Sequence, residues 1–186
     1  LRLGASEFTV GLLMALFAAL PMALSVWSGR LIDRLGPRRP LLVGLAALTL
    51  ANVLPFAWPR LEVLYLSSTL GGTGFLLVHI AMNSVFGAHG TPEQRAINFS
   101  WLALAFSVSG SLGPIVAGLA IDYLGHARAF PALAAFPFLA VALLFFRKKR
   151  LPAPDRKGRQ EGSVMELLRI RPLRDTFIVS GLLAMG

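Results

Sequence analysis

Five stretches of this chain contain no charged residue and are each long enough to cross a lipid bilayer. They run from 18 to 30 residues, and a helix needs roughly 20 apolar residues to span a hydrocarbon core of ~30 Å. The expected fold class is therefore all-α, a polytopic transmembrane helix bundle. The expected spans lie at about residues 8–29, 40–58, 63–86, 97–121 and 129–146.

Composition excludes a soluble domain. Hydrophobic residues make up 55% of the chain, which would leave several helices apolar on every side with nothing polar to face water. The first span is no secretory signal, because Arg2 and Glu7 precede it and it exceeds an apolar region of ~7–15 residues. The absence of cysteine excludes disulfides and thiolate metal sites.

Both ends of the chain suggest an internal fragment of a longer protein. The chain opens on Leu1, and a sixth apolar run starts at Thr176 and continues to Gly186. We expect residues 147–175 to form a cytoplasmic central loop with a short amphipathic helix, since Ser163 and Glu166 have capping-box spacing. Residues 176–186 would begin a C-terminal transmembrane half, which is an expected partner of this half.

The net charge of +9 follows topology and does not indicate nucleic-acid binding. If loops 30–39, 87–96 and 147–175 are cytoplasmic, 15 of the 18 Lys and Arg residues lie inside, against Arg2, Arg60 and Arg128 outside. The positive-inside rule predicts this asymmetry. We therefore expect an integral protein of a bacterial inner (plasma) membrane, with the lipid bilayer as a partner.

A charged turn between the first two spans recurs in degenerate form. Residues 29–36 and 118–125 both read G-x-x-I-D-x-L-G. Three crossings separate Asp33 from Asp122, so the two turns lie on opposite sides of the membrane, as in an inverted repeat. The alternative is ordinary turn chemistry, glycine for backbone freedom and aspartate as a cap, and this explanation suffices for Asp122 and Gly125.

Two motifs resemble the major facilitator superfamily of transporters. The first turn, with Gly29, Asp33, Arg34, Gly36, Arg38 and Arg39, is similar to the loop between that family's second and third helices. Gly113-Pro114-Ile-Val-Ala117-Gly118 resembles an element of its fifth helix, with Ala117 replacing a glycine. The resemblance implies the second to sixth helices, the central loop and the start of the seventh, with the first helix absent from an inverted 3+3 repeat.

The resemblance also assigns roles to these motifs. It implies that Asp33 and the arginines form a conformational switch that clamps the two halves shut on the cytoplasmic side. Asp33 can also cap a helix N-terminus. Independently of any family, Ser109, Gly113 and Ala117 form a small-residue stripe that permits close helix packing, while Pro114 frees a carbonyl and bends the helix.

One ionisable residue lies well inside a span. His79 shares a helical face with Asn83, one turn later, and with Gly72, two turns earlier. An ionisable group inside the membrane indicates a residue that lines the path of the transported solute, and an imidazole changes charge near neutral pH. The alternative is a neutral histidine that forms a hydrogen bond with a neighbouring helix. Weaker candidates for this path are Asn52, Ser107 and Ser111.

Together these features predict a secondary active transporter that moves a small solute by alternating access. The Gly113-Pro114 element is frequent in drug or metabolite exporters of the family, which favours efflux. However, Ser68 stands where many proton-coupled exporters carry arginine, so the sequence does not identify the coupling ion. No cofactor or metal is expected. The alternatives are an uptake permease or uniporter, or a membrane-embedded enzyme or scaffold, which dispersed histidines make less favoured.

Overall fold

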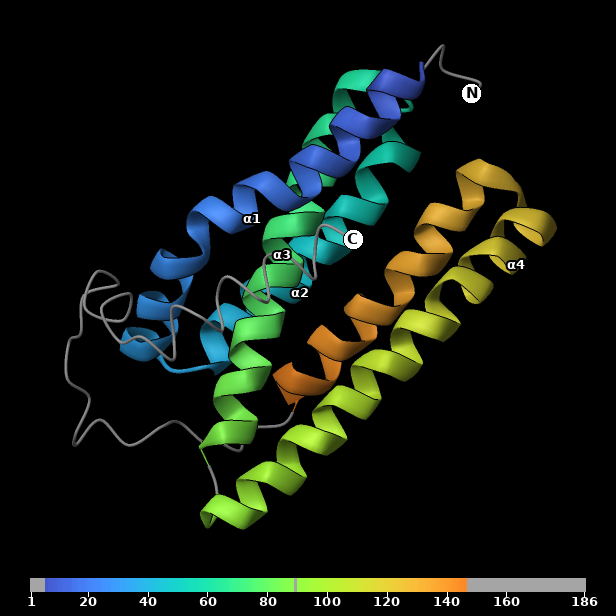
Figure 1. Cartoon of the computed structure of the whole chain (residues 1–186). Helices are drawn as coiled ribbons and strands as arrows, with labels where there is room; N and C mark the ends of the chain where they lie inside the picture. Colours follow the sequence, from blue (N-terminus) through green and yellow to red (C-terminus); the bar gives the residue numbers. More distant parts are fainter. Residues whose placement is uncertain (1–5, 89, 147–186) are drawn as a thin grey trace. The chain divides into compact units, whose positions relative to one another are not determined.

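A computed structural model of the chain describes residues 6–88 and 90–146. The regular elements of this part are helices, and each is long and apolar enough to cross a membrane. The predicted all-α fold class is confirmed, while the expected 147–175 loop, its amphipathic helix and the 176–186 segment lie outside the described residues. Figure 1 shows the four helices, α1 (Glu7–Leu35), α2 (Arg38–Ala57), α3 (Leu61–Gly87) and α4 (Pro92–Phe146).

The loops between these helices are shorter than expected. Helix α1 continues to Leu35, so the turn within 30–39 contracts to Gly36 and Pro37. The helix persists because Ile32, at 1% exposure, belongs to the core. The loop within 87–96 contracts in the same way. Thr91 and Gln94 there form a capping box that starts α4, with each side chain bonded to the other's backbone N–H.

Helix α4 consists of two helical segments joined at Gly125, where the backbone leaves the helical region at φ 78° and ψ 161°. Figure 1 shows α4 folding back on itself within its length, where the ribbon passes from yellow into orange. The two segments contain the spans expected at 97–121 and 129–146. Pro114 does not interrupt the helix, since Gly125 is the position in α4 with non-helical backbone angles.

Helix α3 contacts each of the other three helices, whereas α1 and α4 do not touch each other. It packs closely on α2 where Gly44 and Gly74 meet. A Cβ added to Gly44 would lie 2.8 Å from the Gly74 carbonyl oxygen, and one added to Gly74 would lie 2.7 Å from the Gly44 oxygen. Only glycine permits the two backbones to pack this closely.

Prolines in α1 and α2 each release a backbone carbonyl toward α3. Pro55 has no N–H to offer the Ala51 carbonyl, and the Ser67 hydroxyl of α3 donates a hydrogen bond to that oxygen instead. Pro21 likewise leaves the Phe17 carbonyl without its usual helical donor. In hydrocarbon, such carbonyls depend on neighbouring helices for satisfaction.

The Phe17 carbonyl lies directly against Gly72 of α3, and a Cβ at Gly72 would overlap it. One turn away, the Ser68 hydroxyl donates to the Leu13 carbonyl at 2.6 Å. Helix α3 therefore meets α1 and α2 through small residues that either donate to a carbonyl or leave room for one.

Near the Gly36 turn, the packing is conventional and apolar. Ile32, Leu41, Leu45 and Ala81 form a buried cluster. Ala140, Val141 and Leu144, from the second segment of α4, pack against it. All four helices thus contribute side chains to the core at this end.

The glycine contact predicts a site-specific loss of stability. Gly74→Ala in the full-length protein should lower the free energy of unfolding by about 1–3 kcal/mol, because the added methyl group meets backbone rather than a mobile side chain. Thermal unfolding in detergent measures this. Gly113→Ala is the matched control, since a Cβ there meets nothing within 4 Å; equal unfolding temperatures for the two variants would contradict the packing account.

Candidate functional site

The two G-x-x-I-D-x-L-G turns share one backbone geometry at their final glycine. Gly36 has φ 76° and ψ 163°, and Gly125 has φ 78° and ψ 161°. This region of backbone angles is essentially restricted to glycine. The agreement supports the interpretation of the two segments as copies of one helix-turn-helix unit.

The two turns differ in their surroundings. Around the first, Pro37 and Pro40 are buried and Asp33 is half-buried; around the second, Asp122, Gly125 and His126 are exposed. The two turns therefore share a backbone geometry but differ in how deeply their residues are buried. The first aspartate is constrained by packed neighbours, while the second lies on the surface of the described chain.

Asp33 precedes the Gly36 turn by three residues. It lies in the last turns of α1, and Pro37 is the N-cap residue of α2 without a side-chain cap hydrogen bond. Among the motif's arginines, Arg34 occupies the last turn of α1, where a cation complements the helix dipole. Arg39 is exposed, and Gly29 has no neighbouring atom within 4 Å of an added Cβ.

Arg38 connects two segments that are distant in sequence. Its guanidinium donates to the Leu144 carbonyl at 3.1 Å, in the last turns of α4, where a cation is again favoured by the helix dipole. This bond ties the start of α2 to the end of α4. The first turn is thereby bonded to the segment that follows the second turn.

The small-residue stripe of α4 makes no close helix contact within the described chain. Ser109, Gly113, Pro114 and Gly118 are exposed and Ala117 is half-buried. A Cβ built at Gly113 or Gly118 meets nothing within 4 Å. The close glycine packing expected here occurs instead on α3.

The structure places His79 within a row of aromatic rings that crosses three helices. Its ring centroid lies 4.8 Å from that of Phe106 on α4 and 5.9 Å from that of Phe75 on α3. Phe75 in turn lies 6.3 Å from Phe17 on α1. These separations fall in the range of attractive ring pairs, ~4.5–7 Å. We call Phe17, Phe75, His79 and Phe106 the ring row.

The ring row follows one face of α3. Ser68, Gly72, Phe75, His79 and Asn83 recur at helical spacing, so they share that face. At ~1.5 Å per residue, Ser68 and Asn83 are about 22 Å apart, most of a ~30 Å hydrocarbon core. Polar groups therefore occur at three depths along an otherwise apolar face.

His79 is exposed, and none of its described neighbours forms a hydrogen bond with its ring nitrogens. Asn83, also expected on the path, donates to the His79 backbone carbonyl at 2.9 Å. An imidazole facing lipid would be costly, and such groups face bundle interiors or cavities. The ring row is thus the best candidate for a solute-facing surface.

The other residues that the sequence suggested for the solute path form no hydrogen bond or ring contact with the ring row among the described residues. Asn52 on α2 donates to the Leu48 carbonyl of its own helix at 2.9 Å. Ser107 and Ser111 are exposed on α4, and Ser107 follows Phe106 directly. No cluster of metal-ligating side chains occurs among the described residues.

Sequence reasoning missed the three phenylalanines of the row and the hydroxyls of Ser67 and Ser68. Two signals were present: the helical spacing of Ser68, Gly72, Phe75 and His79, and the rule that proline frees the carbonyl four residues earlier. Neither signal alone names the partner helix. That assignment required the packed structure.

The described helices are long and apolar enough to cross a membrane, which indicates a polytopic membrane protein. A model of the Major Facilitator Superfamily matches residues 2–186. The chain belongs to this superfamily, and the predicted resemblance is confirmed. It is accordingly an integral membrane protein of a transporter family.

Several curated relatives carry names of resistance proteins. The chain is 30% identical over 141 residues to "Tetracycline resistance protein, class B" of Escherichia coli, covering 75% of this chain and 35% of the relative. It is 25% identical over 151 residues to "Multidrug resistance protein 2" of Bacillus subtilis, covering 81% and 38%. "Quinolone resistance protein NorA" of Staphylococcus aureus is 27% identical over 138 residues, covering 74% and 35%. The chain thus spans little more than a third of these relatives.

The turn geometry predicts that both final glycines resist substitution. Gly36→Ala and Gly125→Ala should each destabilise the full-length protein by about 1–3 kcal/mol, because an L residue is strained at these backbone angles. Gly29→Ala and Gly118→Ala are helical controls with open space and should be neutral or stabilising. The unfolding temperatures of the four variants measure this effect. Gly125→Ala that unfolds at the wild-type temperature would refute a shared turn geometry.

Proposed function

We propose that the full protein is a secondary active transporter that exports a small solute by alternating access. Membership of the superfamily supports transport. Export is supported by the names of the relatives, which are resistance proteins for tetracycline, several drugs or quinolones. The solute is a drug-like compound or a metabolite, and this chain contributes one half of its path.

The observation that carries this proposal is the ring row, on the face of α3 that α1 meets at Ser68 and Gly72. The exposed imidazole of His79 lies there between the rings of Phe75 and Phe106. Small-molecule sites are typically apolar and aromatic, with a few polar groups that set orientation. The row has this composition, and the face of α3 that carries it runs from Ser68 to Asn83 over about 22 Å of bilayer depth.

The two turns are the parts of this chain that we assign to the change between the two conformations of the transporter. With the Gly36 turn on the cytoplasmic face, the Gly125 turn lies on the opposite face, as expected for inverted repeats that rock about a central site. The Asp33 turn acts as the switch, because it is packed against a core to which all four helices contribute. Acidic residues of the described spans lie near helix ends, so coupling groups are assigned to other parts of the protein.

Asp33→Asn tests the switch. In the full-length protein it should reduce export about tenfold while membrane insertion and expression stay near the wild-type level, since removing one ~1.4 kcal/mol interaction shifts an equilibrium about tenfold. Export is measured as solute uptake into everted membrane vesicles, normalised to protein amount.

Asp122→Asn is the control for this experiment. It occupies the matching position of the second copy but is exposed, so it should leave export within about twofold of wild type. Loss of expression in Asp33→Asn with normal activity per molecule would assign Asp33 a structural role and remove the switch from the proposal.

A further inference from the structure

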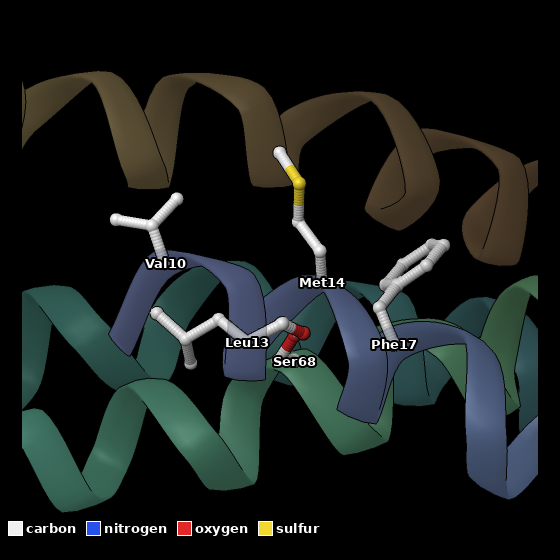
Figure 2. A pocket seen from close by; sticks show the side chains of 5 residues that line it. All are labelled: Val10, Leu13, Met14, Phe17 and Ser68. Atoms are coloured by element: carbon white, nitrogen blue, oxygen red, sulfur yellow. The ribbon is translucent and has the colours of Figure 1, made fainter. Parts of the chain in front are cut away.

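A hollow of about 340 Å³ lies between α1 and α3, at one end of the ring row. It is lined by Val10, Leu13, Met14 and Phe17 of α1 and by Ser68 of α3. Figure 2 shows Val10, Met14 and Phe17 projecting from the same side of α1, with the Ser68 hydroxyl beside Leu13. The volume is at the lower end of the range for small-molecule pockets, ~300–1,000 Å³.

Phe17 belongs both to this hollow and to the ring row. Its ring centroid lies 6.3 Å from that of Phe75, and its side chain is 43% exposed. A flat ring placed against Phe17 would therefore extend an existing series of ring contacts. This continuity connects the hollow to the path that His79 occupies.

The position of Phe17 is fixed by its own backbone. The carbonyl that Pro21 releases packs against Gly72 without room for a Cβ. The ring is thus attached to the point where α1 and α3 are closest. Because its backbone is held by this contact, the ring has fewer positions to lose when a solute binds, which reduces the entropic cost of binding.

Ser68 is the polar side chain that lines the hollow. Its hydroxyl has a single hydrogen, and this hydrogen is donated to the Leu13 carbonyl at 2.6 Å. The oxygen keeps lone pairs that can only accept. A ligand that satisfies Ser68 must therefore bring an N–H or O–H donor.

We propose that the hollow binds an uncharged solute that has a flat ring and an N–H or O–H group. The ring stacks on Phe17, and the donor bonds to the Ser68 hydroxyl. No lining residue carries charge, so nothing in the hollow offsets the desolvation of an ion. A lipid acyl chain fits less well, because it has neither a ring nor a donor. The assignment of this ligand as transported solute rests on the proposed function.

Two naphthalene derivatives, both uncharged at neutral pH, test the proposal. The probe 2-naphthol has a hydroxyl donor, and 2-methoxynaphthalene has the same rings without one. Binding is measured by probe fluorescence to full-length protein in lipid nanodiscs, after subtraction of empty nanodiscs. Wild type should bind 2-naphthol about two- to tenfold more tightly than the methoxy probe, the usual effect of one hydrogen bond.

Substitutions in the hollow should separate the two contributions. Ser68→Ala should weaken 2-naphthol about two- to tenfold and leave 2-methoxynaphthalene unchanged, whereas Phe17→Leu should weaken both. Ser67→Ala is the matched control, because it removes an equivalent bond from α3 to a backbone carbonyl, that of Ala51, outside the hollow. Ser68→Cys retains volume with a poor acceptor and replaces Ser68→Ala if that variant cannot be purified.

Equal affinities for the two probes, or a Ser68 variant that binds 2-naphthol as wild type does, would overturn the proposal. The same conclusion follows if neither probe shows saturable binding, the result expected of a hollow filled by an acyl chain. Because binding is measured without transport, a protein that binds 2-naphthol as expected but exports nothing would refute the proposed function alone.

Discussion

The packing of the helices depends on how α3 accommodates backbone carbonyls of α1 and α2. The hydrocarbon of the membrane offers these carbonyls no hydrogen-bond donors. Prolines in α1 and α2 each remove one helical donor, at Phe17 and at Ala51. Ser67 donates to the second carbonyl, and Gly72 leaves space for the first. In hydrocarbon an unsatisfied carbonyl costs several kcal/mol, so the Ser67 bond favours the face of α3 that meets α2, while Gly72 permits the close approach of α1. Phe75 and His79 of the ring row lie on the same face of α3 as Gly72, beyond its contact with α1.

Covering two faces of α3 has a consequence for the site. Once α1 and α2 pack against small residues, the bulky side chains Phe75 and His79 are left where α1 and α4 do not meet. Phe17 and Phe106 reach this face from those two helices and complete the row. The same prolines and glycines that hold the bundle together therefore also position its aromatic surface. The Gly36 and Gly125 turns reverse the chain with equal geometry at the two ends of the repeat.

Sequence alone predicted the fold class and the superfamily correctly, because both depend on local signals: runs without charge and a charged motif of fixed spacing. It placed His79 on a candidate path because an ionisable group in an apolar span is conspicuous, and the structure adds the ring neighbours. It placed a loop at 30–39 from the distribution of charges, and the structure adds that helix α1 continues through much of this stretch, to Leu35. The contact of His79 with Phe106 joins helices that are distant in sequence, and no local pattern specifies it. The same holds for Gly44 with Gly74.

The central claim is that the ring row faces an aqueous path that opens to each side of the membrane in turn. Phe75→Cys in the full-length protein, with no other cysteine, tests it with a membrane-impermeant maleimide applied to either side. Labelling from both sides, slowed by transported solute, is the predicted result, with Leu50→Cys, exposed in the middle of α2, unreactive from both. Phe75→Cys that reacts only with a membrane-soluble reagent, as a lipid-facing position would, contradicts the account.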